Sequence, residues 1–200
     1  MTTTSITAAL LRRTLAGAPL DEHYQLEAAL AWHQLRPTGR LTAARPAGPP
    51  LLSVTETDRE EVAARLARLL HGLAWATVTR APGHGRPVRI EVRRTAYDRV
   101  VRALSGTWRH VRHQFATATA GDPGAAAALW RMALLIGDVS PDHDTVRVRA
   151  RTPDAAEVLA NAAASLNAVV AVDRVRGGYA VMVYRSGDVR RLLVAAMSGA

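Results

Sequence analysis

The amino-acid sequence predicts an α+β protein made of a duplicated unit, with two halves related by a pseudo-twofold axis. The same order of helical and strand-like hydrophobic periodicity occurs twice along the chain. The letters also correspond: LSVTETDREEVAARL matches VRVRARTPDAAEVLA, and VRIEVRRTAYDRVVRAL matches AVMVYRSGDVRRLL. The matching segments are offset by about 94 residues. Chance similarity between two stretches rich in Ala, Val and Arg is the alternative explanation.

The first half is expected to begin with an apolar helix at 21–35, followed by strands at 40–44 and 51–56. Thr57 with Glu60 forms the pattern of a capping box, which satisfies two free amides at the start of a helix. The apolar face of that helix comprises Val62, Leu66, Leu69, Leu70 and Leu73. A strand at 74–80, a turn at 82–85, a strand at 87–93 and a short helix at 95–104 complete the half.

The second half repeats this order. A helix is expected at 122–137 and a strand at 145–151, and Thr152-Pro153 is an N-cap followed by proline at the first helical position. A strand at 168–174, a hairpin turn at Gly177-Gly178, a strand at 179–185 and a last helix capped by Ser186 follow. We therefore expect an N-terminal extension at 1–20, a first half at 21–104, a linker at 105–121 and a second half at 122–200.

Composition limits the possible functions. The 200 residues are 48% hydrophobic and include no cysteine, which excludes disulfides, thiolate metal sites and cysteine catalysis. The net charge is +9, and all 26 basic residues are Arg. This excess favours polyanionic partners. No apolar run reaches the roughly 18 residues of a membrane span, and no signal peptide is recognisable. A cytoplasmic, nucleoid-associated protein is expected.

Alternating strand residues predict one apolar and one basic face for each sheet. Arg147, Arg149 and Arg151 occupy every second position of one strand, and Arg89 and Arg93 share a face of another. Planar guanidinium groups suit contact with phosphates. The candidate nucleic-acid-binding residues are Arg40, Arg80, Arg89, Arg93, Arg147, Arg149, Arg151, Arg174 and Arg176. An ordinary solvated face is the alternative. With four Trp, four Tyr and one Phe, a base-stacking platform for single strands is not expected.

The segment WRMALLIGDVSPD at 130–142 resembles the second motif helix of the WhiA sporulation-regulator family, whose amino-terminal part has a LAGLIDADG homing-endonuclease-like fold. The elements that follow and the ending YRSGDVRRLLVAAMSGA extend the resemblance over most of 20–200. It implies a duplicated LAGLIDADG fold whose two halves form an antiparallel sheet saddle. Gly137 matches the glycine that allows the two motif helices to touch, and its counterpart, Trp32, is far larger. Both are candidates for packing between the halves.

The same resemblance argues against catalysis. Asp142 falls where homing endonucleases place a metal-binding acid, but the first-half counterpart is Pro37, which cannot ligate. Cleavage by a two-metal mechanism needs an acid from each half. We therefore expect no enzyme activity, no cofactor and no metal site, with Asp142 as a weak metal candidate. The pair His110 and His113, and the acidic loop at 138–144, are expected to be solvated surface.

The expected function is a non-catalytic DNA-binding or transcription-regulatory scaffold that contacts the backbone of duplex DNA without reading its sequence. The resemblance implies RNA polymerase holoenzyme or a WhiB-like protein as further partners. WhiA proteins also carry a helix-turn-helix domain, and no recognition helix of that kind is evident up to Ala200. Sequence-specific promoter binding is therefore not carried over. A protein-interaction or ligand-sensing α+β module without nucleic acid binding is the alternative.

Overall fold

Two three-stranded antiparallel sheets form the frame of the computed structural model, which describes residues 3–35, 50–80, 87–116, 121–137 and 145–198. The first sheet has the order β1-β3-β2, from β1 (Leu51–Thr57), β2 (Ala76–Arg80) and β3 (Val88–Arg93). The second has the order β4-β6-β5, from β4 (Val146–Ala150), β5 (Val170–Val175) and β6 (Gly178–Val183). The equal strand order is what a duplication predicts.

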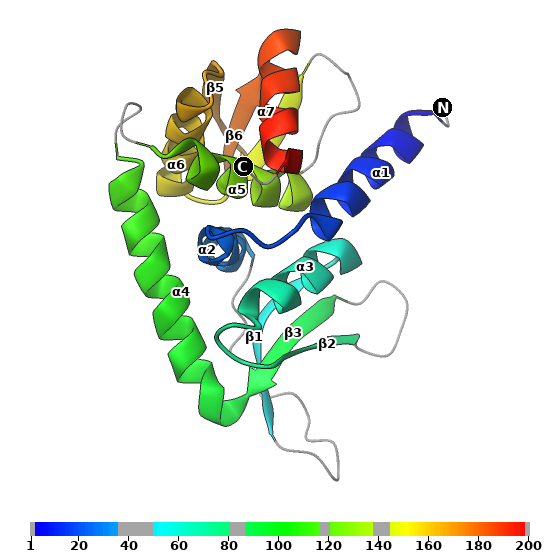
Figure 1. Cartoon of the computed structure of the whole chain (residues 1–200), viewed down its shortest axis with the longest axis vertical. Helices are drawn as coiled ribbons and strands as arrows, with labels where there is room; N and C mark the ends of the chain where they lie inside the picture. Colours follow the sequence, from blue (N-terminus) through cyan, green and yellow to red (C-terminus); the bar gives the residue numbers. More distant parts are fainter. Residues whose placement is uncertain (1–2, 36–49, 81–86, 117–120, 138–144, 199–200) are drawn as a thin grey trace.

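The helices alternate with the strands in the same repeated order in both halves. They are α1 (Thr3–Gly17), α2 (Tyr24–Gln34), α3 (Glu60–Leu70), α4 (Arg94–Gln114), α5 (Pro123–Ile136), α6 (Pro153–Ser165) and α7 (Ser186–Ser198). The series α2-β1-α3-β2-β3-α4 corresponds element by element to α5-β4-α6-β5-β6-α7. Figure 1 shows α2 and α5 at the centre of the molecule, with one sheet on either side of them. The expected α+β duplication is confirmed.

Several boundaries differ from the expected ones. The segment at 1–20 contains α1, which packs on α3 and α5 and buries Leu15 completely. Helix α4 continues to Gln114 instead of ending at 104, so the first part of the expected linker at 105–121 is helical. The expected strand at 40–44 and turn at 82–85 lie outside the described residues.

The capping predictions have mixed outcomes. Thr152 accepts a hydrogen bond from the Ala155 N–H group, as predicted. Asp122, which was expected as the first residue of its helix, is the cap of α5, and its side chain accepts hydrogen bonds from the N–H groups of Gly124 and Ala125. Thr57 does not form the predicted capping box, because β1 continues through it. Its hydroxyl accepts a hydrogen bond from the Arg59 N–H at 3.2 Å, and the helix begins only at Glu60. Ser186 is the first residue of α7 rather than its cap.

The central helices α2 and α5 pack against each other, as expected, but they are not apolar all round. Glu27 of α2 is fully buried, and Arg131 of α5 is 1% exposed. Arg65 of α3, also fully buried, donates to both carboxylate oxygens of Glu27, at 3.0 Å from Nε and 2.8 Å from Nη2. Arg131 Nη1 donates to the same carboxylate from the opposite half. One carboxylate thus joins an arginine of each half.

Other donors of these two arginines reach further elements, whereas Arg131 Nη2 is buried without a hydrogen-bond partner among the described atoms. Arg131 donates to the Ala196 carbonyl of α7 at 2.7 Å and to Asp21 at 2.9 Å. Arg65 donates to the carbonyl oxygens of Ala18 and Pro19, just after α1. This buried ion network, Arg65–Glu27–Arg131 with Asp21, therefore ties α1, α2, α3, α5 and α7 together at the middle of the fold.

A second contact between the halves lies toward the end of α2. The His33 ring stacks on Trp108 of α4, with 4.2 Å between centroids and 17° between planes. Its Nε2 lies 2.9 Å from the hydroxyl of Thr152, which caps α6. Burial lowers the pKa of His33, and the nearby Arg151 and Arg112 act in the same direction against an opposing effect of Asp154. The stack is therefore formed by neutral imidazole at neutral pH.

Replacement of Glu27 by Gln should destabilise the protein strongly. The variant leaves the buried Arg65 guanidinium group without its charged partner and leaves Arg131 with Asp21 alone. Loss of one partner from a buried pair costs about 3–5 kcal/mol. The free energy of unfolding in urea measures this effect. Glu60→Gln is the matched control, because Glu60 pairs with Arg80 on the surface and such pairs contribute about 1 kcal/mol or less. Equal losses in the two variants would contradict the role given to the network.

Stability should also fall in mildly acidic solution because of His33. Its pKa in the folded protein is below the usual histidine value, because the ring is buried, so the unfolded chain binds the proton more readily. The stabilisation is complete above the unfolded pKa and is lost as the pH falls toward the lowered folded pKa. His33→Phe keeps a ring against Trp108 and removes the titration, so its free energy of unfolding should fall less between about pH 7.5 and about pH 5.5. Identical pH dependence of the two proteins would contradict this assignment.

Candidate nucleic-acid interface

The open face of the second sheet carries two of the predicted arginines. Val146, Val148 and Ala150 are buried, whereas Arg147 and Arg149 alternate with them and are exposed. Since α6 packs on this sheet, the buried row is its helix-covered face. Strand pairing places Arg147 beside Met182 and Arg149 beside Ala180, and Asp173 of β5 lies on the other side of Ala180. Arg147 and Arg149 thus lie on the open face, as the alternation of this strand predicts, with one carboxylate at the edge of the sheet. That this face binds nucleic acid stays a prediction.

The equivalent face of the first sheet is less basic than predicted. Val88, Ile90 and Val92 are buried on one side, and Arg89, Glu91 and Arg93 alternate on the other. Arg89 Nε donates to Glu56 of β1 at 2.7 Å, and Glu91 is 1% exposed. Arg93 alone among the three is well exposed, at the end of β3. Carboxylates therefore offset much of the positive charge on this half of the surface.

Two of the predicted arginines lie on the wrong face. Directly opposed residues of an antiparallel pair share a face. Arg80 opposes Val88 and forms an ion pair with Glu60 of α3, so it belongs to the helix-covered side. Arg174 opposes Tyr179, in the row that continues to Ala150. The sequence contained this signal, because each arginine has the strand parity of the Val and Ala residues of its own strand. Both strands are sheet edges, and their Val78 and Val172 are exposed.

The hairpin and loop candidates complete the set. Arg176 lies in the turn between β5 and β6 and is exposed, and its carbonyl accepts a hydrogen bond from Arg149 Nη2. Gly177, which follows with φ +79°, allows that tight reversal. Arg40 lies outside the described residues.

Arg151 does not extend the basic row, because the strand ends at Ala150 and the side chain turns to α2. Its Nη1 donates to the Leu35 carbonyl at 3.0 Å and approaches the Gln34 carbonyl at 3.5 Å. Its backbone N–H donates to the Gln34 side chain at 3.0 Å. The last carbonyls of a helix lack intrahelical partners and carry partial negative charge, so a guanidinium group satisfies both needs.

Arg59 makes the reciprocal contact, which the sequence analysis missed. Its Nη1 donates to the carbonyl oxygens of Ile136 at 2.7 Å and Gly137 at 2.6 Å, with Leu135 at 3.3 Å, at the end of α5. Arg59 and Arg151 both lie in the turn from the first strand of a half to its next helix. Each half thus supplies an arginine to the end of the other half's central helix.

The two residues expected at the helix contact have different surroundings. At Gly137, a Cβ would lie 2.8 Å from the Ala133 carbonyl oxygen and 3.0 Å from Val148 Cγ1, both in its own half. The glycine is therefore required for packing of α5 on β4. Trp32 is half-buried against the core, and its Nε1 is buried without a hydrogen-bond partner among the described atoms. That it widens the helix crossing stays a prediction.

Metal-ligand candidates are scarce in the described structure. Its residues include no group of three or more His, Asp or Glu side chains that could hold an ion. Asp142, the other acidic-loop residues at 138–144, and Pro37 lie outside the described residues. His110 and His113 are exposed on α4 beside Arg109 and Arg112, as expected for a basic surface. No helix in the described part of the chain is both long and apolar enough to cross a membrane.

Comparison with known proteins identifies similar folds. No family model matches the sequence, and no curated protein does. Among solved structures, the N-terminal LAGLIDADG domain of WhiA aligns with a TM-score of 0.60 at 12% identity, over 94% of this chain and 89% of that one. Full-length WhiA from Thermatoga maritima gives the same TM-score and identity, and the chain spans 60% of its length.

A homing endonuclease is similar as well. I-DmoI in complex with DNA and Mn aligns with a TM-score of 0.56 at 13% identity, over 88% of this chain and 98% of that one. A second structure of I-DmoI with its target DNA gives 0.59 at 12% identity. These similarities agree with the element order, the paired sheets and the adjacent central helices. The chain therefore has the duplicated fold of the LAGLIDADG homing endonucleases, which is also the fold of the WhiA N-terminal domain.

Proposed function

We propose that this protein is a non-catalytic scaffold that binds the backbone of duplex DNA and acts in transcription regulation. The observation that carries the proposal is the exposed pair Arg147 and Arg149 on the open face of the β4-β6-β5 sheet. Side chains two positions apart on a strand are about 7 Å apart and point the same way, so both can reach phosphates of one groove edge. The net charge of +9 favours the same partner.

The similar folds support DNA as the ligand. The I-DmoI structures contain DNA, and the chain aligns with nearly the whole of that protein. Sequence readout is not part of the proposal, because guanidinium groups on phosphates fix position and carry no base information. The regulatory role, a nucleoid location, and RNA polymerase holoenzyme or a WhiB-like protein as partner rest on the resemblance to WhiA.

The arginines at the central helix ends support the absence of catalysis. A divalent ion needs nearby carboxylates, and a positive charge beside it opposes its binding. Arg59 lies against the end of α5 and Arg151 against the end of α2. Homing endonucleases place a metal-binding acid at the ends of these motif helices. Here both ends have a guanidinium group, in addition to the proline at position 37.

Removal of the two open-face arginines should weaken DNA binding about equally for all duplex sequences. Each phosphate contact contributes about 0.9 to the slope of log K against log salt. Arg147→Ala/Arg149→Ala should therefore reduce the slope by up to about 1.8, measured by fluorescence anisotropy between about 50 and about 200 mM salt.

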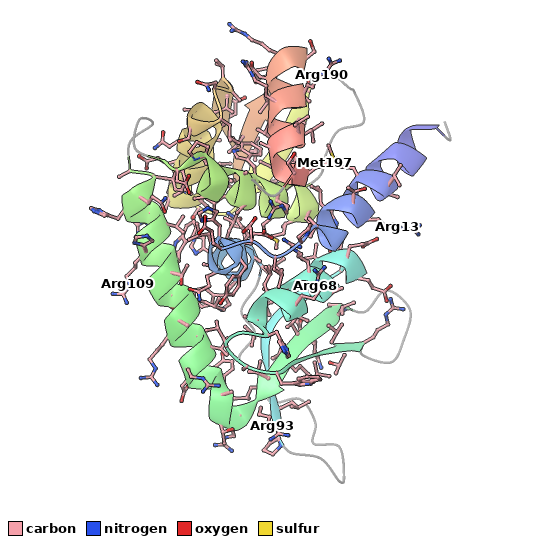
Figure 2. The ribbon with its side chains drawn as sticks, in the orientation of Figure 1. Arg13, Arg68, Arg93, Arg109, Arg190 and Met197 are labelled. Carbon is pink, nitrogen blue, oxygen red and sulfur yellow. The ribbon has the colours of Figure 1, made fainter. Side chains whose placement is uncertain are left out.

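Arg174→Ala/Arg190→Ala is the matched control for charge. Both residues are exposed in the same half, Arg174 on the opposite side of the sheet and Arg190 on α7. Figure 2 shows Arg190 projecting from that helix. An equal loss of affinity in both double variants would show that the net charge of the protein, and not the position of Arg147 and Arg149, determines DNA binding. Absence of duplex binding by the unchanged protein would favour an interaction module without nucleic acid binding.

The protein should not cleave DNA in the presence of Mg²⁺ or Mn²⁺. Two-metal hydrolysis needs ligands from both halves at the scissile phosphates, and Pro37 supplies none. Incubation with supercoiled plasmid, followed by gel electrophoresis, tests this expectation. Cleavage that disappears in Asp142→Asn would show that another acid of the first half replaces the one expected at Pro37.

A further inference from the structure

Trp75 is the most exposed large apolar side chain in the described structure, at 73%. It follows α3 and directly precedes β2, in the half that is not assigned the DNA-contacting pair. An exposed tryptophan is unusual, because its large apolar surface stabilises a protein or a complex most when it is buried. Tryptophan is also the residue type most enriched among side chains that dominate protein–protein binding.

The chain holds Trp75 on a fixed turn. The Leu70 carbonyl at the end of α3 accepts hydrogen bonds from the N–H groups of Leu73 at 2.8 Å and Ala74 at 2.9 Å. Arg99 of α4 donates to the Leu73 carbonyl at 2.8 Å. His71 packs edge-on to the indole, with 5.5 Å between ring centroids. These hydrogen bonds fix the backbone that presents Trp75, and the His71 ring supports one edge of the indole.

Trp75 lines two hollows. The first, of about 330 Å³, is lined by Leu20, Ala67, Arg68, His71, Trp75 and Ala76. The second, of about 440 Å³, is lined by Ala74, Trp75, Arg93, Thr95, Ala96 and Arg99. Each has small apolar residues at its wall and is large enough for one bulky apolar side chain of a partner.

The charge around these hollows has one sign. Arg68 lines the first, and Arg93 and Arg99 line the second, while none of the described lining residues is acidic. Figure 2 shows Arg68 on α3 and Arg93 at the end of β3 nearest the start of α4. A ligand that fills the hollows with apolar groups and surrounds them with carboxylates would complement this surface in both shape and charge.

We propose that Trp75 and the two hollows beside it form a docking site for an acidic segment of another protein, one in which Asp or Glu residues flank a large apolar side chain. The apolar side chain packs against the indole in a hollow, and the carboxylates pair with Arg68, Arg93 and Arg99. Single-stranded nucleic acid fits less well, because base-stacking surfaces use several aromatic side chains and Trp75 has only the edge-on His71 beside it.

Selection from a phage library of random peptides of about twelve residues, on the whole protein and with counter-selection on Trp75→Ala, tests the proposal. Enriched peptides should contain Trp, Phe or Leu flanked by Asp or Glu. A synthetic peptide of the most enriched sequence should bind Trp75→Ala about tenfold more weakly or worse. Tyr184→Ala is the control, because Tyr184 is also a largely exposed aromatic residue, on the other half. It should bind the peptide as the unchanged protein does.

Three outcomes would overturn the proposal: enriched peptides without acidic bias, a labelled single-stranded oligonucleotide whose binding depends on Trp75, or a dimer in sedimentation that Trp75→Ala converts to a monomer. Trp75→Ala removes a surface side chain and should leave the circular dichroism spectrum unchanged. Duplex DNA binding should also be unchanged in this variant, so failure of the DNA proposal and failure of the docking proposal give different results.

Discussion

The carboxylate of Glu27 is the group on which the arrangement of the two halves depends. It is fully buried, it accepts hydrogen bonds from Arg65 of its own half, and it accepts another from Arg131 of the other half. Transfer of such charges from water costs several kcal/mol per ion, which only well-aligned partners offset. A shift of α5 along α2 would break this alignment, so the network selects one relative position of the central helices. The contacts of Arg131 with α7 and of Arg65 with the end of α1 extend that constraint to the outer helices.

The contacts between the two halves are symmetric at the ends of the central helices and asymmetric in the middle of these helices. At the ends, each half supplies one guanidinium group to the other: Arg59 to α5 and Arg151 to α2. In the middle, a single carboxylate on α2 serves arginines from both halves. The two copies of the unit thus keep their pseudo-twofold arrangement, although the residues that α2 and α5 contribute to the central contact differ. The His33 stack on Trp108 strengthens the same asymmetry, because it joins α2 to α4 close to the cap of α6.

Local patterns in the sequence predict most of the elements but not the contacts between them. The cap at Thr152 was predicted because donor and acceptor lie within one turn, and the cap at Asp122, one residue before proline at the first helical position, carries the same local signal but was read as part of the helix. Thr57 was misassigned because pairing of β1 with β3 extends the strand through it. Strand alternation correctly placed Arg147 and Arg149 on the open face. Arg80 and Arg174 were assigned to that face wrongly, because the alternation within their own strands was not considered. Glu27 and Arg65 are 38 positions apart, and Arg59 and Gly137 are 78 apart, so no local pattern marks either contact. Trp75 was missed because its exposure is decided by the turn that presents it.

Arginine side chains supply positive charge at the ends of both central helices. Four carbonyl groups at a helix C-terminus lack backbone partners, and the helix dipole adds negative potential there. A divalent ion held by nearby carboxylates and an arginine are two ways of placing positive charge in that region, and they exclude each other electrostatically. The arginine needs no carboxylate, and one of its nitrogens can reach several carbonyls, as Arg59 Nη1 does at Leu135, Ile136 and Gly137. A chain that uses arginine at both ends stabilises its central helices and joins its halves by the same contacts.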